Sequence, residues 1–261
     1  MKFGAKSATQ DPAHWVEEVQ RILPGFDSFT LDCPYPLPEI PAAITKRLRE
    51  LCDQRGLAYL IHTPVGRIAL GDTNSVVRDA SIQQMYHAIA MAVQIGAGLI
   101  IVHPTPCSNS ERATLAQRER LQCEALIEIC ARADGLGIVI ALENMQSPNV
   151  YASGFVDMNS HFALLERIPV LGITLDVGHA NMSGIPLRDT VLRLGQRLRH
   201  VHVHDNDRFA DQHLPVGRGT VDWRSFAQVL VQIGYTGVLE FEFQGEAALL
   251  ASKRYLENLF Q

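Results

Sequence analysis

Side chains that bind metals or move protons recur along this chain of 261 residues. Histidine closes two apolar runs, AYLIHTP and LIIVHPT, and a carboxylate closes IVIALEN and GITLDVGH. Two later runs, RHVHVHDND and GVLEFEF, alternate polar with apolar residues. The residues concerned are His62, His103, Glu143, Asp176, His179, His200, His202, His204, Glu240 and Glu242. Imidazole and carboxylate groups together are typical ligands of zinc and manganese, so this pattern indicates metal chemistry.

The apolar runs that carry these residues read as β-strands. Eight such runs occur, at residues 1–5, 28–33, 57–62, 98–103, 138–143, 171–176, 199–204 and 237–243. Segments with helical spacing separate them, the longest at 74–96 and 110–133. Asp11-Pro12 is typical of a helix start, whereas Pro24-Gly25 and the pair Gly135 and Gly137 are typical of helix ends.

Strict alternation of strand and helix predicts parallel strands joined by right-handed crossovers. Eight units without a break in composition predict that residues 1–261 form a single (β/α)8 TIM barrel in the α/β class. The main rival, an open doubly wound sheet, usually has a glycine-rich phosphate loop after its first strand, and none is present.

A barrel brings the polar residues to one place, because the C-terminal ends of all its strands meet at the catalytic face. Each residue alone has a simpler explanation, such as a satisfied core histidine or half of a buried salt bridge. Those explanations fit poorly when six consecutive strands each end in a metal-binding residue type. Converging carboxylates would repel one another unless a cation lay between them, so a metal cluster is expected.

Composition excludes several other classes of protein. The net charge is −5 and no run of Lys or Arg occurs, which disfavours a nucleic-acid binder. The five cysteines show no C-x-x-C spacing and are expected to be reduced thiols. No stretch is long and apolar enough for a membrane span, and the N-terminus lacks the apolar core of a signal peptide. We therefore expect a cytoplasmic protein without a membrane partner.

Four longer motifs give the chain a family resemblance. They are LDVGHAN (175–181), HVHDND (202–207), DQHLPVGRGTVDW (211–223) and GYTGVLEFE (234–242). With them the chain resembles the xylose isomerase-like TIM barrels, a superfamily that includes the endonuclease IV family (AP endonuclease family 2) and sugar phosphate isomerases and epimerases. The similarity extends over nearly the whole chain, and the D-x-H-L-P-x-G-x-G run is its most specific part.

The resemblance implies a set of metal ligands. By the endonuclease IV pattern, His62, His103 and Glu143 correspond to a first zinc site. Glu143 would bridge to a second site, and a loop would supply most of the third. The second site would comprise Glu143, Asp176, His202 and Glu242, and the third His179, Asp211 and His213. The implied cofactors are up to three zinc ions, or manganese or magnesium.

Other residues near these motifs are candidates for substrate contacts or supporting roles. His202 is preferred over His204 as a ligand because Asp205 follows it by three positions, as in the family pattern. Glu242 is preferred over Glu240 from its spacing after Gly237. The predicted substrate-binding residues are His204, Arg218 and Glu240, with Arg67 a further cation that could meet a phosphoryl group.

Two enzymatic functions fit this pattern. A trinuclear site favours a hydrolase that activates water against a small phosphorylated or sugar-like substrate. The alternative is a sugar or sugar phosphate isomerase or epimerase with one metal, in which Glu143 and Glu242 form the catalytic acid/base pair. The Asp211 and His213 pair would be superfluous in the alternative, which tilts the sequence reading toward the hydrolase.

Two further functions are expected less. A non-enzymatic metal-binding barrel would usually have lost some ligands. An abasic-site DNA endonuclease would carry aromatic and arginine side chains in its loops. Here Thr63-Pro64-Val65-Gly66 follows His62, and the loop CPYPLPEIP offers Tyr35 but no basic cluster. Nucleic acid is therefore not an expected partner.

Overall fold

The computed structural model describes residues 1–22, 25–107, 113–146, 155 and 157–261. Its strands form a closed barrel in the order of the sequence, and every neighbouring pair is parallel. The strands are β1 (Lys2–Lys6), β2 (Ser28–Asp32), β3 (Ala58–His62), β4 (Ala97–Val102), β5 (Val139–Glu143), β6 (Gly172–Asp176), β7 (Leu198–Val203) and β8 (Val238–Phe241). The predicted (β/α)8 barrel is confirmed.

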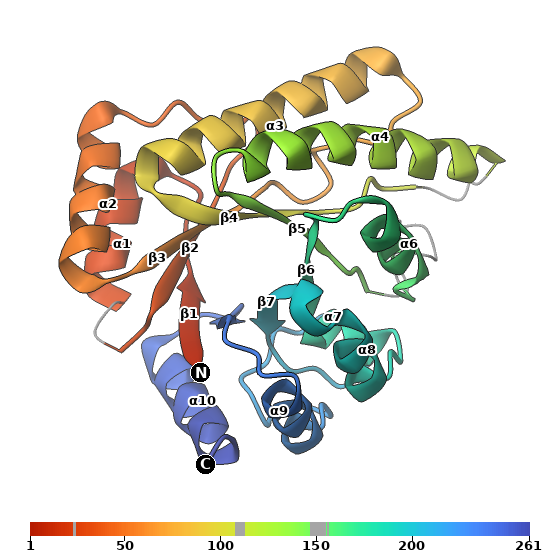
Figure 1. Cartoon of the computed structure of the whole chain (residues 1–261). Helices are drawn as coiled ribbons and strands as arrows, with labels where there is room; N and C mark the ends of the chain where they lie inside the picture. The colour runs from red at the N-terminus through yellow and green to blue at the C-terminus, as the bar shows by residue number, and fades with distance from the viewer. Residues whose placement is uncertain (23–24, 108–112, 147–154, 156) are drawn as a thin grey trace.

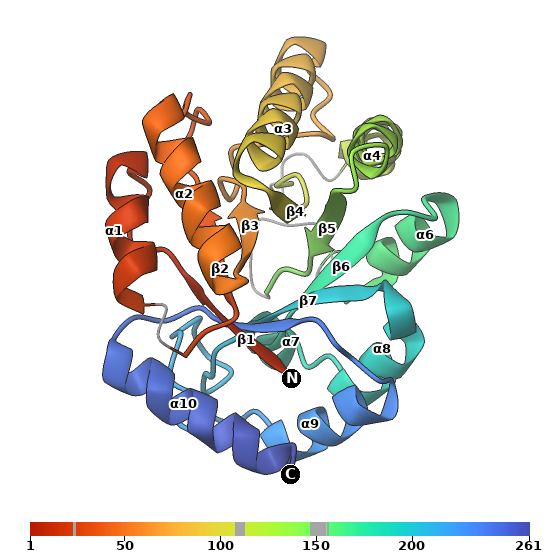
Figure 2. The ribbon, with the colours of Figure 1, turned by 60° about the vertical axis from the view of Figure 1, so that its left-hand side comes forward.

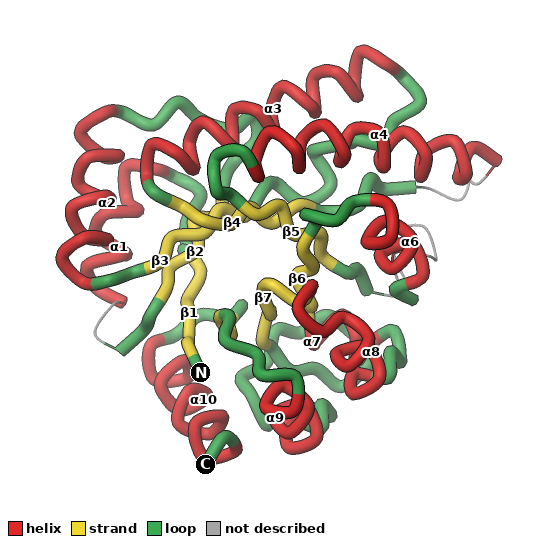
Figure 3. The backbone as a smooth tube through the Cα atoms, in the orientation of Figure 1, coloured by secondary structure: helices red, strands yellow, loops and turns green. Residues whose placement is uncertain are grey.

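Helices surround the ring of strands, as Figures 1 and 3 show. They are α1 (Pro12–Ile22), α2 (Ala42–Arg55), α3 (Ser75–Ile95), α4 (Leu115–Asp134), α6 (Asn159–Arg167), α7 (Val177–Met182), α8 (Leu187–Leu194), α9 (Trp223–Gln232) and α10 (Glu246–Leu259), with a short 3-10 turn, η2 (Gly195–Arg197). After a turn of the view, α1 and α2 flank one side of the barrel and α9 and α10 another (Figure 2).

Local signals in the sequence explain where several helices begin and end. Asn74 caps α3 by accepting from the amide of Val76, and Gly96 closes that helix at a φ of 80°. Asp11 accepts a bond from the amide of Ala13 at the start of α1. The predicted helix end at Pro24 and the first three residues of the predicted 110–133 helix lie outside the described residues.

Alternation along each strand separates an apolar outer layer from a polar interior. On β7, Val201 and Val203 point to the surrounding helices while His200 and His202 point into the barrel, and all four are fully buried. Phe29, Leu175 and Phe241 belong to the same outer layer of the core. The apolar layer between strands and helices therefore holds the fold together, which leaves the interior free for polar residues.

Candidate active site

The polar residues predicted at the strand ends converge at the mouth of the barrel. Strand register aligns them, because Asp176 lies opposite His202 in the β6–β7 pair and Asp32 opposite His62 in the β2–β3 pair. The side chains of Glu143 and Glu242 are 3% and 5% exposed, and that of His202 is fully buried. Burial of so many ionisable groups demands compensation by opposite charge.

His202 lies at the centre of a group of three carboxylates. Its Nδ1 atom is 3.4 Å from Oε2 of Glu143 and 3.4 Å from Oε2 of Glu242. The same nitrogen is 3.8 Å from Oδ2 of Asp176. Ligand atoms around a tetrahedral cation with bonds of ~2.0–2.1 Å lie about 3.3–3.4 Å apart, so the spacings to Glu143 and Glu242 match a metal site and Asp176 lies slightly beyond.

Two histidines from neighbouring strands approach the same oxygen of Glu143. His62 Nε2 lies 3.2 Å from His103 Nε2, and the latter lies 3.1 Å from Oε2 of Glu143. His62 donates from Nδ1 to Asp32 over 2.8 Å, which leaves its Nε2 lone pair directed at the cluster. A carboxylate behind a histidine in this way is typical of metal-binding histidines.

The third predicted group comes together at the rim. His179 Nε2 and His213 Nε2 each lie 3.3 Å from Oδ2 of Asp211. His213 is the more exposed, has a φ of 47°, and stacks on His204 with ring centroids 4.0 Å apart. The structure thus brings all nine predicted ligands to one face of the barrel.

The helix α7, which the sequence analysis did not predict, positions His179. Asp176 caps this helix by accepting a bond of 2.7 Å from the amide of His179. The imidazole Nδ1 of His179 then donates to the backbone oxygen of Asn144 over 2.9 Å. The helix is six residues long and follows its strand without a loop, so no separate helical period marks it in the sequence.

A buried carboxylate shapes the loop that carries Asp211 and His213. Asp205 accepts bonds from the amides of Gly217 and Val221 and from the indole nitrogen of Trp223. A side chain at Gly219 would lie 2.3 Å from Oδ1 of Asp205, so glycine is required there. Trp223, the first residue of α9, is buried and thereby ties this loop to the helix.

Lys6 and Asp32 belong to the cluster although the sequence analysis did not name them. Lys6 Nζ donates to Oε1 of Glu242 over 2.9 Å and lies 3.6 Å from Asp32. Burial alone would lower the pKa of Lys6, but the two carboxylates outweigh it and the pKa is raised. Lys6 ends β1 and Asp32 ends β2, so the strand-end position that marks His62 on β3 marks these two residues as well.

Of the predicted substrate-contact residues, the structure brings some to the cluster and not others. His204 lies 3.0 Å from Asp176, inside the group. Glu240 is fully buried one layer below Glu242, on the far side of His202 from the carboxylates. Arg218 is exposed in a turn whose Gly217 lies against Tyr255 of α10, and its amide bonds to the backbone oxygen of Pro215. Substrate contact by Glu240 and Arg218 stays a prediction.

The electrostatic field of the cluster is strongly negative. Burial works against ionisation of Glu143, yet the neighbouring His202 and His103 hold its pKa well below the usual value. Burial likewise opposes protonation of His202, but Glu242 and Glu143 raise its pKa to about 10. The carboxylates that stabilise the proton on His202 also attract a metal cation. Binding of that cation would displace the proton from the imidazole.

Unsatisfied atoms support the fit of a metal to these residues. Oε2 of Glu143 and Nδ1 of His202 are buried and form no hydrogen bond with correct geometry among the described residues. Buried polar atoms are normally paired, so atoms without partners that face one another indicate a missing ligand or water. The donor set of one imidazole and three carboxylates suits zinc, manganese or magnesium.

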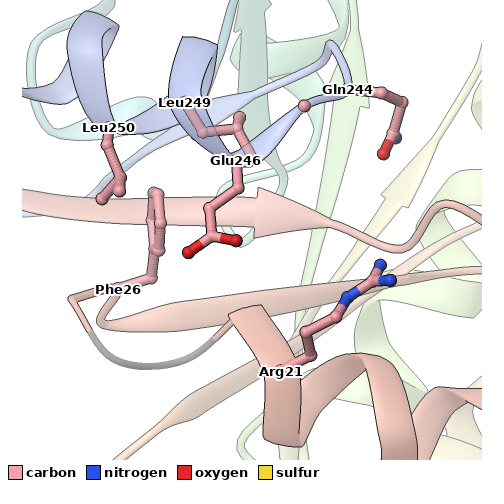
Figure 4. Close-up of a pocket in the computed structure, with 7 residues that line it drawn as sticks. Arg21, Phe26, Gln244, Glu246, Leu249 and Leu250 are labelled. Carbon is pink, nitrogen blue, oxygen red and sulfur yellow. The ribbon is translucent and has the colours of Figure 1, made fainter.

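A cavity of about 530 Å³ opens beside the cluster. Lys6, Asp32 and His62 form its inner wall, and the remaining lining residues are Gln10, Pro34, Tyr35, Pro64, Val65 and Arg67. A cavity of about 260 Å³ lies elsewhere, between the end of α1 and the start of α10, with Arg21, Phe26 and Glu246 among its lining residues (Figure 4). The first cavity adjoins candidate ligands and the second does not, so the first is the candidate substrate site.

Comparison with known families agrees with the fold and with the resemblance in the motifs. A family model described as xylose isomerase-like TIM barrel matches residues 16–259. The chain belongs to this family. Among the described residues, no helix is both long and apolar enough to cross a membrane.

Individual relatives narrow the comparison. An uncharacterized protein of Methanocaldococcus jannaschii is 29% identical over 266 residues, which cover 100% of this chain and 90% of that protein. The fructoselysine 3-epimerase of Shigella flexneri is 26% identical over 208 residues, covering 77% of this chain and 73% of that enzyme. The crystal structure of a D-tagatose 3-epimerase-like protein superposes with a TM-score of 0.86 at 28% identity, covering 99% of this chain and 97% of the other.

Proposed function

We propose that this protein is a divalent-metal-dependent epimerase or isomerase of a small sugar, with a ketose as its substrate. The observation that carries the proposal is the arrangement of Glu143, Asp176 and Glu242 within 3.4 to 3.8 Å of one imidazole nitrogen of His202. Relatives of this chain that are named as sugar 3-epimerases support the same reading. The epimerase alternative thus takes precedence over the hydrolase that the sequence analysis favoured.

Two of the four residues are suited to proton transfer as well as to metal binding. Glu143 ends β5 and Glu242 follows β8, so their carboxylates reach the mouth from separate sides of the barrel. A metal held by Glu143, Asp176, His202 and Glu242 would polarise a ketone and its neighbouring hydroxyl. One carboxylate then takes the proton from the carbon beside the ketone, and the other delivers a proton to the opposite face.

Neighbouring residues keep Glu143 ionised and orient Glu242 for proton transfer. The low pKa of Glu143 keeps it ionised, as a base must be at neutral pH. Lys6 holds Oε1 of Glu242, which leaves Oε2 directed at His202. The cavity lined by Gln10, Tyr35 and Arg67 offers hydrogen-bonding groups to the hydroxyls of the sugar.

A second candidate function is a metal-activated-water hydrolase. The observation in its favour is the convergence of His179, Asp211 and His213, which an epimerase with one metal does not need. With His62 and His103 this group would complete the trinuclear set implied by the resemblance to endonuclease IV.

The two functions differ in what happens to a substrate in heavy water. Protein loaded with Mn²⁺ is incubated with a panel of free and phosphorylated ketoses in D2O, and the products are followed by NMR and phosphate release. We expect one ketose to be epimerised with deuterium incorporated at the epimerised carbon. Release of phosphate without exchange would support the hydrolase. Neither exchange nor release from any member would contradict an epimerase acting on these sugars.

A further inference from the structure

A second polar layer lies in the barrel interior, directly beneath the candidate ligands. It contains Glu240 of β8, His200 of β7 and Thr30 of β2, and each is fully buried. Thr30 donates its hydroxyl to Oε2 of Glu240, and His200 Nε2 lies 3.5 Å from the same oxygen. An interior this deep in a barrel is usually filled by branched apolar side chains, so this layer requires a reason.

The two ring nitrogens of His202 face the two layers. Nδ1 points up to the carboxylates of Glu143 and Glu242, each at 3.4 Å. Nε2 points down, where Oε1 of Glu240 lies 3.7 Å away. Neither Nε2 of His202 nor Oε1 of Glu240 has a hydrogen-bond partner among the described residues, and both are buried.

Metal binding at Nδ1 fixes what Nε2 must do. A neutral imidazole that gives the lone pair of Nδ1 to a metal carries its proton on Nε2. That proton points into the interior, where an unsatisfied donor costs about 1–3 kcal/mol. Glu240 offers the acceptor oxygen, since its Oε1, which is itself buried without a partner among the described residues, lies 3.7 Å from Nε2.

We propose that Glu240 is a positioning residue for the metal centre. Its carboxylate accepts a hydrogen bond from Nε2 of His202. The inference rests on the metal site of the proposed function. The hydroxyl of Thr30 occupies Oε2 of Glu240, which His200 Nε2 also approaches to 3.5 Å, so that Oε1 is the oxygen that remains for His202. The lower layer thereby fixes the ring so that its Nδ1 lone pair faces the metal. Outer carboxylates of this kind commonly change metal affinity by ~10- to 100-fold when they are removed.

The test compares three variants in the same layer. Glu240→Met removes the acceptor and fills the space, and Glu240→Gln keeps one neutral acceptor oxygen. Thr174→Val is the matched control, since Thr174 is equally buried and pairs with His200 in the strand register, but its hydroxyl has no hydrogen-bond partner among the described residues. For each variant, the dissociation constant of Mn²⁺ and the visible spectrum of the Co²⁺ form are measured beside the thermal midpoint.

We expect Glu240→Met to weaken Mn²⁺ binding by ~10- to 100-fold and to alter the Co²⁺ spectrum, with Glu240→Gln between it and the wild type. Thr174→Val should bind as the wild type does. Equal Mn²⁺ affinity in the wild type and a folded Glu240→Met protein would overturn the positioning role. So would two ions per wild-type chain of which Glu240→Met loses one, because Glu240 would then be a ligand. Failure of the wild type to bind any divalent ion would instead remove the proposed function.

Discussion

The two halves of the barrel contribute different chemistry to the same mouth. Strands β5 to β8 supply the three carboxylates and the central imidazole: Glu143, Asp176, His202 and Glu242. Strands β1 to β4 supply a cation, an acceptor and two imidazoles: Lys6, Asp32, His62 and His103. The β5–β8 half therefore has the composition of a complete metal site, whereas the β1–β4 half adjusts the charge and orientation of that site.

The same comparison separates the two candidate functions. An epimerase with one metal needs the β5–β8 half as its metal site and the cavity beside Lys6 as its substrate site. A trinuclear hydrolase also needs His62 and His103 as ligands, together with Asp211 and His213 of the rim. Substitutions in the two halves and in the rim should therefore have unequal effects.

The largest loss of activity is expected from substitution in the β5–β8 half. Glu143→Gln keeps the shape of the side chain but removes the base, and loss of a general acid or base typically costs ~10²- to 10⁴-fold in rate. The kcat for the ketose found in the substrate panel should fall by that amount. Glu17→Gln, on the exposed face of α1, is the control and should leave kcat unchanged. A fall of less than tenfold for Glu143→Gln would remove it from the reaction.

An intermediate effect, on stability, is expected from substitution in the β1–β4 half. Lys6→Met leaves Glu242 and Asp32 without their neighbouring cation, and because the Lys6 side chain is 19% exposed this should cost ~1–3 kcal/mol, between the values for surface and fully buried ion pairs. Urea denaturation should show a loss of that order in the free energy of unfolding. The control Lys2→Met lies on the same strand, but Lys2 is exposed and should tolerate the change. Equal stability of both variants would mean that Lys6 does not compensate the carboxylates.

A change in stability that appears only in acid is expected when His161, which contacts the backbone of Glu143, becomes protonated. His161 of α6 is fully buried and donates from Nε2 to the backbone oxygen of Glu143, and burial lowers its pKa from 6.5 to about 4. A histidine with a lowered native pKa contributes stability above the unfolded value, and this contribution is lost as the pH falls from 6.5 toward 4. Between pH 7.5 and 5 the loss should be ~2 kcal/mol.

The check is urea denaturation at both pH values for the wild type and for His161→Gln. Glutamine can still donate to the oxygen of Glu143 but cannot titrate, so this variant should lose less stability in acid. The same acid sensitivity in both proteins would assign the effect to other buried histidines.

The smallest effect is expected at the rim. His213→Ala removes a half-exposed side chain whose partner is Asp211, and a one-metal epimerase does not use it. Activity should stay within a few-fold of the wild type, since substitutions away from the reacting groups usually cost little. A loss comparable with that of Glu143→Gln would favour the trinuclear hydrolase.

The sequence alone predicts the ring of strands because eight apolar runs alternate with segments of helical spacing. Strand bounds differ by only one or two residues, as at β7, predicted at 199–204 and found at Leu198–Val203. Depth within the barrel could not be predicted in the same way. Glu240 and Glu242 share a strand face, and two residues move a side chain by ~6–7 Å along the strand. In the register His202 lies opposite Glu240, and only the side-chain distances show that Glu242 meets its Nδ1 while Glu240 meets its Nε2.

We propose that the β5–β8 half holds one catalytic metal. A count of tightly bound Mn²⁺ ions tests this most directly. Protein freed of metal is titrated by calorimetry as the wild type, as Asp176→Asn and as His213→Ala. We expect one tight ion per chain in the wild type and in His213→Ala, and none in Asp176→Asn. Three ions in the wild type, with one lost in His213→Ala, would contradict it.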